Sequence, residues 1–158
     1  MKVSECMTRD PRVASPNQPL RTAAHIMEEM DIGFLPVGEN DRLVGVITDR
    51  DIAMRGVSRG HDGNTQIGDL MSGRVRYCFE NDDVNSVLDN MGQLQVRRLV
   101  VLDQDKRLAG VVTIGDISRA NNSSMPKTGA ALCEISKNGT EHIQQGKGKG
   151  KSSARASS

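Results

Sequence analysis

Two short stretches of the sequence place a threonine three residues before an aspartate, directly after an apolar run. They are Thr48-x-x-Asp51 in GVITDRDI (45–52) and Thr113-x-x-Asp116 in GVVTIGDI (110–117). This spacing is close to a capping box, in which both side chains satisfy free backbone groups at the start of a helix. Local capping is therefore one complete interpretation of either stretch.

The same geometry also suits binding of a phosphorylated sugar. A helix N-terminus offers free N–H groups and a positive dipole end. An aspartate accepts hydrogen bonds from the two hydroxyls of a ribose, and the guanidinium of Arg50 could pair with a phosphate through two hydrogen bonds. Because the pattern occurs twice, we expect two related pockets across a pseudo-two-fold axis.

The two stretches belong to a long internal repeat. When the chain is shifted by 64 residues, VSECM (3–7) falls on IGDLM (67–71), and five apolar positions with helical spacing in 20–30 fall on apolar positions in 84–94. After one inserted residue the shift becomes 65, and RLVGVIT (42–48) falls on RLAGVVT (107–113). A repeat of this length decides the interpretation of the whole chain.

Each copy predicts the same order of elements. An amphipathic helix over 18–31 or 83–94 is followed by an extended run, a polar turn and a strand rich in Val and Ile. A second helix begins after Thr48 and after Thr113. We expect the apolar helix faces, including Met27, Met30 and Met91, to pack into the core.

These segments closely resemble a tandem pair of cystathionine-β-synthase (CBS) domains over about residues 1–120. The resemblance rests on the repeated helix, the LVGVITDRDI and LAGVVTIGDI segments, and the CMT and LMS leads. It implies an α+β fold in which each repeat forms a short mixed sheet with two helices. The two repeats pack into one disc-like module with pseudo-two-fold symmetry, which often pairs into homodimers.

The resemblance also implies a function. Many such modules are regulatory, do no chemistry themselves, and bind AMP, ADP, ATP or S-adenosylmethionine in clefts between the repeats. The family's ribose-contacting positions correspond here to Thr48, Asp51, Thr113 and Asp116. Its base-lining positions correspond to Val13, Ala14, Tyr77 and Cys78. The candidates for the basic residues that bind phosphate near the cleft are Arg50, Arg97 and Arg98. No cofactor is required, and the partner that receives the signal is an unknown protein.

The sequence departs from the family pattern at two places. Val100 stands where the family often has proline, which Pro36 provides in the first copy, and Gly115 stands in the place of Arg50. We therefore expect the two sites to differ in phosphate affinity. Since some CBS pairs bind no nucleotide, the alternative is a ligand-free dimeric scaffold for protein interactions.

Composition narrows the other possibilities. The net charge is +1 and there is no Trp, so nothing favours specific nucleic-acid binding. The N-terminus has no apolar signal core, and no run approaches the length of about 20 apolar residues that a membrane helix needs. We expect a cytoplasmic protein, not an enzyme, without membrane association.

The thiols and imidazoles show no metal-ligand spacing, and we predict no metal site and no disulfide framework. These residues are Cys6, Cys78, Cys133, His25, His61 and His142. They are interpreted as incidental or structural side chains. A redox-sensitive Cys78 is the alternative, and it would need a lowered pKa.

We expect four segments along the chain. They are repeat 1 (1–56), a Gly-rich polar linker (57–66), repeat 2 (67–120) and a tail (121–158) rich in Ser, Gly and Lys. The tail is expected to be mostly disordered, with a short helix around 129–135. Its basic end carries Lys147, Lys149, Lys151 and Arg155.

Overall fold

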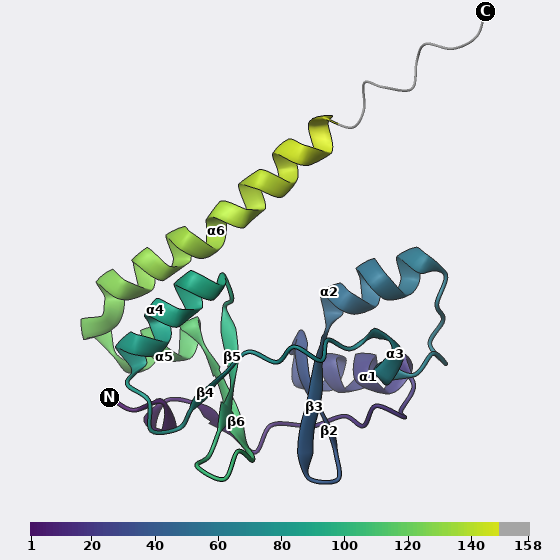
Figure 1. Cartoon of the computed structure of the whole chain (residues 1–158), viewed down its shortest axis with the longest axis horizontal. Helices are drawn as coiled ribbons and strands as arrows, with labels where there is room; N and C mark the ends of the chain where they lie inside the picture. Colours follow the sequence, from purple (N-terminus) through teal and green to yellow (C-terminus); the bar gives the residue numbers. More distant parts are fainter. Residues whose placement is uncertain (149–158) are drawn as a thin grey trace, which may run out of the picture.

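The computed structural model describes residues 1–148, with side chains described through 137. Figure 1 shows two lobes side by side, each built around a β-hairpin whose turn points the same way. The first lobe contains α1 (Leu20–Met30), β2 (Phe34–Glu39), β3 (Arg42–Thr48), α2 (Asp49–Asp51), η2 (Ile52–Gly56) and η3 (Val57–Arg59). The second contains β4 (Tyr77–Phe79), α4 (Val84–Leu94), β5 (Arg98–Leu102), β6 (Leu108–Thr113) and α5 (Ile114–Ala120).

The amphipathic helices form where the repeated apolar spacing predicts them. α1 and α4 each bury one face and end at a residue in the left-handed conformation, Asp31 (φ 51°) and Gln95 (φ 55°). Met27 and Met91 lie in the cores, as predicted. The prediction is wrong for Met30, which is 50% exposed because it lies in the last turn of α1 beyond the lobe core.

The two sheets share one pairing pattern. In the second lobe the strand order is β1-β6-β5-β4, where β1 is Thr8–Arg9. In the first lobe β2 and β3 pair alone, and single bridges replace the edge strands: Ala14 with Val37, and Val46 with Ser72. These bridges fall at the repeat-equivalent positions of the second sheet, so the α+β fold with pseudo-two-fold symmetry is confirmed.

The short segment that leads into each repeat packs on the lobe of the other repeat. Val3 and Met7, in and after η1 (Val3–Glu5), belong to the core of the second lobe. Ile67 and Leu70, in α3 (Ile67–Leu70), belong to the core of the first lobe. This exchange ties the two lobes together through their hydrophobic cores.

The C-terminal region differs from the expected disordered tail. After η4 (Asn122–Ser124), helix α6 (Met125–Gly148) packs on α4 and α5 and then runs away from the lobes (Figure 1). Ala131 and Ile135 are buried in the core of the second lobe. The side chains of Lys147, Lys149, Lys151 and Arg155 lie outside the described residues.

Candidate functional site

Both Thr-x-x-Asp stretches form complete capping boxes where a strand passes into a helix. The Asp51 N–H donates to Thr48 Oγ1 at 3.1 Å, and the Thr48 N–H donates to Asp51 Oδ2 at 3.0 Å. The corresponding distances for Asp116 and Thr113 are 3.1 and 2.9 Å. The predicted capping role is confirmed, and it fixes one oxygen of each carboxylate. We call these two sites the first junction (48–51) and the second junction (113–116).

The other oxygen of each aspartate faces an arginine on the same helical segment. Arg55 Nη2 lies 3.1 Å from Asp51 Oδ1 and also donates to the Leu70 carbonyl at 2.6 Å. Arg119 Nη2 lies 2.5 Å from Asp116 Oδ1. The aspartate side chains are 23% and 16% exposed. Each junction therefore presents a partly buried, positioned carboxylate beside a cation.

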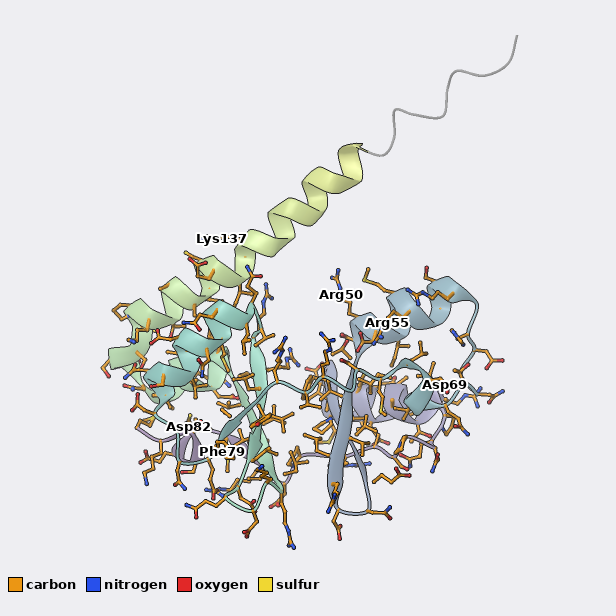
Figure 2. All side chains as sticks on the ribbon, viewed as in Figure 1. Arg50, Arg55, Asp69, Phe79, Asp82 and Lys137 are labelled. Carbon is orange, nitrogen blue, oxygen red and sulfur yellow. The ribbon has the colours of Figure 1, made fainter. Side chains whose placement is uncertain are left out.

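The remaining charges differ between the junctions. Arg50 is exposed at the first junction, and Figure 2 shows it with Arg55 at the upper end of the first lobe. At the second junction Gly115 occupies the place of Arg50. Arg97 is exposed, and its backbone carbonyl accepts the N–H of Ile114 at 3.0 Å. The structure therefore places Arg97 directly beside the second junction.

A contact between the lobes brings the two junctions toward each other. The Arg98 guanidinium lies over the Phe34 ring, 5.5 Å from its centroid, a favourable cation–π arrangement. Phe34 pairs with Thr48 across β2 and β3, and Arg98 pairs with Thr113 across β5 and β6. Arg98 therefore links the junction end of one hairpin to the junction end of the other.

The predicted base-lining residues divide into two pairs. Val13 and Tyr77 are exposed at 43% and 50%, whereas Ala14 and Cys78 are buried in the lobe cores at 1% and 3%. This alternation follows from extended backbone, in which successive side chains point to opposite faces. Of these four residues, only Val13 and Tyr77 therefore have exposed side chains, and the assignment of all four to a base pocket stays a prediction.

Two surface pockets lie at the opposite end of the hairpins, around their turns. One, of about 630 Å³, includes Val13, and the other, of about 780 Å³, includes Tyr77; both include Arg42 and Arg107. Neither pocket includes a residue of the two junctions. The two junctions, which hydrogen bonds and ion pairs hold in place, are therefore the candidate site.

Burial controls the chemistry of Cys78. Desolvation, followed by the nearby charges of Asp82 and Cys6, raises the pKa of the Cys78 thiol to about 12. A thiol with a raised pKa is rarely ionised and reacts slowly. This finding contradicts the redox-sensitive alternative for Cys78.

Sequence reasoning missed three residues of the site. Arg55 and Arg119 lie four and three residues after the junction aspartates, a spacing that brings side chains together on a helix, and this signal could have identified both. Phe34 could not be identified in this way, because its contact with Arg98 depends on how the lobes pack.

The match to a known protein family covers the same two repeats. A family model described as "CBS domain" matches residues 3–57 and 67–123. The chain is 37% identical over 134 residues to the CBS domain-containing protein YhcV of Bacillus subtilis, which covers 85% of this chain and 94% of that protein.

Two solved structures share the fold. The crystal structure of Hypoxic Response Protein I with two coordinated zinc ions has a TM-score of 0.70 at 36% identity, covering 77% of this chain and 99% of that one. The CBS domain pair of protein MJ0100, in complex with 5-methylthioadenosine and S-adenosyl-L-methionine, has a TM-score of 0.69 at 28% identity, covering 78% and 98%.

Neither a metal-binding cluster nor a membrane-spanning helix is found among residues 1–148, with side chains taken through 137. Within that part of the chain, no group of three or more His, Cys, Asp or Glu side chains is arranged to hold a metal ion. None of the described helices has the length and apolar character needed to cross a membrane.

Proposed function

The chain belongs to the CBS domain family, and from this premise we propose that it is a regulatory module. It binds an adenosine-containing ligand, namely AMP, ADP, ATP or S-adenosylmethionine, in clefts between the two repeats. Ligand binding is passed on as a signal to a partner protein. The module requires no cofactor and catalyses no reaction of its own.

The observation that carries this proposal is the duplicated junction. Each copy holds a partly buried aspartate in place through a capping box, with the second oxygen turned toward a cation. A carboxylate fixed in this way can accept hydrogen bonds from ribose hydroxyls without first losing conformational freedom. The adenosine ligands in the MJ0100 structure support this class of ligand.

The ligand's other groups would meet nearby side chains. At the first junction Arg50 is exposed and close enough in sequence to reach a phosphate attached to a ribose held by Asp51. Arg97 and Arg98 supply positive charge at the second junction. Tyr77 lines a pocket around the hairpin turns, but it pairs with Val100, two residues along β5 from Arg98, and offers exposed surface for a base there. Val13 is the exposed residue at the equivalent position of the first repeat. A neutral sugar and an anionic group would thus be bound by different side chains.

Thermal unfolding tests the proposal. AMP, ADP, ATP and S-adenosylmethionine are each added to the wild type, to Asp51→Ala and to Asp116→Ala. At about 100 times its dissociation constant a ligand adds about 2.7 kcal/mol, which raises Tm by about 5–15 °C. We expect one ligand to do so, and at least one aspartate variant to lose the shift.

The control is Asp105→Ala, which removes an exposed aspartate from the turn between β5 and β6. It should keep the full shift. If none of the four ligands raises Tm in the folded wild type, the sensor proposal is wrong.

A second candidate function, a dimeric interaction scaffold, is favoured by exposed apolar side chains. Met30 and Leu94 occupy equivalent positions in the two repeats and are 50% and 39% exposed. Ile32, two residues after Met30, is 36% exposed. Because both positions lie just before β2 and β5, a homodimer formed there would lie next to the junctions.

A further inference from the structure

The two junctions differ in which arginine side chains lie beside the aspartate. At the first junction Arg55 is held between Asp51 and the Leu70 carbonyl, while Arg50 is exposed. At the second junction the place of Arg50 is taken by Gly115. From the sequence this loss alone predicts a weaker phosphate site.

The structure shows a different arginine over that glycine. A Cβ built on Gly115 would lie 3.2 Å from Arg119 Nη1 and 3.6 Å from Thr113 Oγ1. The same guanidinium contacts Asp116 Oδ1 through Nη2. Arg119 therefore occupies the space that the missing side chain at residue 115 leaves open.

Arg119 also retains the capacity to bind an anion. A guanidinium has five N–H donors, and the described contacts of Arg119 use Nη2 alone. Its side chain is 73% exposed, so the remaining donors face solvent. The repeat-equivalent residue at the first junction is Met54, which has no charge. The second junction thus has two exposed arginines, Arg97 beside it and Arg119 on α5.

We propose that Arg119 binds phosphate at the second junction together with Arg97, and that it takes the part that Arg50 has at the first junction, where the second has Gly115. Asp116 then binds the ribose while Arg119 binds the phosphate of an adenosine phosphate. This inference rests on the proposed function, and it predicts that the second junction distinguishes AMP from adenosine.

Isothermal titration calorimetry with AMP and with adenosine tests this proposal. The full chain carries Asp51→Ala, which removes binding at the first junction. In this background Arg119→Ala should weaken AMP binding about tenfold, which corresponds to the loss of one charge-assisted hydrogen bond. The same variant should weaken adenosine binding by less than about threefold. Arg119→Ala with Gly115→Arg rebuilds the arrangement of the first junction and should restore AMP binding.

Two further variants separate charge from positioning. Arg119→Gln keeps a donor for Asp116 without the positive charge, and it should lose the preference for AMP over adenosine as Arg119→Ala does. Arg59→Ala removes an exposed arginine of the first lobe and should change neither affinity. Tm without ligand checks that each variant is folded.

Three outcomes would overturn the proposal. If Arg119→Ala leaves AMP affinity unchanged, the arginine does not bind phosphate. If AMP and adenosine are weakened equally, Arg119 only positions Asp116. If the protein with both junctions intact does not bind AMP, this inference fails. The proposed function fails with it only if ADP, ATP and S-adenosylmethionine are not bound either.

Discussion

Each junction aspartate divides its two carboxylate oxygens between the backbone and an arginine. Asp51 and Asp116 each accept a backbone N–H with Oδ2, and each pairs with an arginine through Oδ1. The cap is a local consequence of the Thr-x-x-Asp spacing, and it fixes the position of the carboxylate before any ligand arrives. Capping and ligand binding are therefore compatible uses of the same residue.

Cys78 provides a residue-level prediction about pH. Its pKa is raised from 9.0 in the unfolded chain to about 12 in the folded protein, mainly by burial. The unfolded chain therefore releases this proton at lower pH. The contribution of Cys78 to stability is complete below about pH 9 and is lost as the pH rises toward 12.

Alkylation followed by mass spectrometry checks this prediction. At about pH 8, Cys133 should react first, because its side chain is exposed to the reagent. Cys78 should react only after denaturation. In urea titrations across the alkaline range, Cys78→Ala should weaken the loss of stability with pH. Equal labelling of Cys78 and Cys133 in the folded protein would contradict the account.

At the scale of elements, the crossing of the lead-in segments brings β1 and β6 into close contact. A Cβ at Gly110, in β6, would lie 2.5 Å from the Thr8 carbonyl oxygen in β1. Gly110→Ala should therefore lower the free energy of unfolding by about 1–3 kcal/mol, measured by urea titration. Gly73→Ala is the matched control, because a Cβ there meets nothing within 4 Å. Equal stability of the two variants would mean that β1 and β6 do not approach closely.

Helix α6 gives a second element-level prediction. Ile135 is 8% exposed and packs in the core of the second lobe, whereas Leu132, on the same helix, is 40% exposed. Ile135→Ala should cost about 2–4 kcal/mol of stability, and Leu132→Ala less than about 1 kcal/mol. Urea unfolding compares them. If both variants match the wild type, α6 does not contribute to the core.

The elements that sequence predicts well are those with a repeated local pattern. α1, α4 and both hairpins follow from apolar spacing and turn residues, because these signals act over a few neighbours. α6 has a composition typical of disordered segments, and its packing depends on α4. A Cβ at Gly92 would lie 3.4 Å from the Ala131 Cα, so this glycine allows close approach of a helix that is distant in sequence.

The candidate site was predictable to a similar degree. Thr48, Asp51, Thr113 and Asp116 follow from spacing alone. The side-chain directions of Ala14 and Cys78, the contact of Arg98 with Phe34, and the exchange of the lead-in segments all depend on tertiary packing, which the local pattern does not contain. Met30 was assigned to the core for the same reason, since the apolar period continues beyond the lobe.

At the scale of the whole molecule, the exposed Met30 and Leu94 predict a homodimer. Exposed apolar residues at equivalent positions of the two repeats are suited to a self-complementary interface. The double variant Met30→Glu, Leu94→Glu should be monomeric in analytical ultracentrifugation. The control is Val57→Glu, which changes a 70% exposed apolar residue outside this surface. The control protein should remain a dimer. A monomeric wild type, or a dimeric double variant, would refute this assignment.

The central claim is that the two junctions form adenosine-ligand sites, and direct calorimetric titration tests it most closely. AMP, ADP, ATP and S-adenosylmethionine are titrated into the wild type and into the Asp51→Ala, Asp116→Ala double variant, with folding of both verified by circular dichroism. We predict saturable binding of at least one ligand to the wild type and its loss in the double variant. Equal binding to both proteins, or no binding of any ligand to the wild type, would contradict the account.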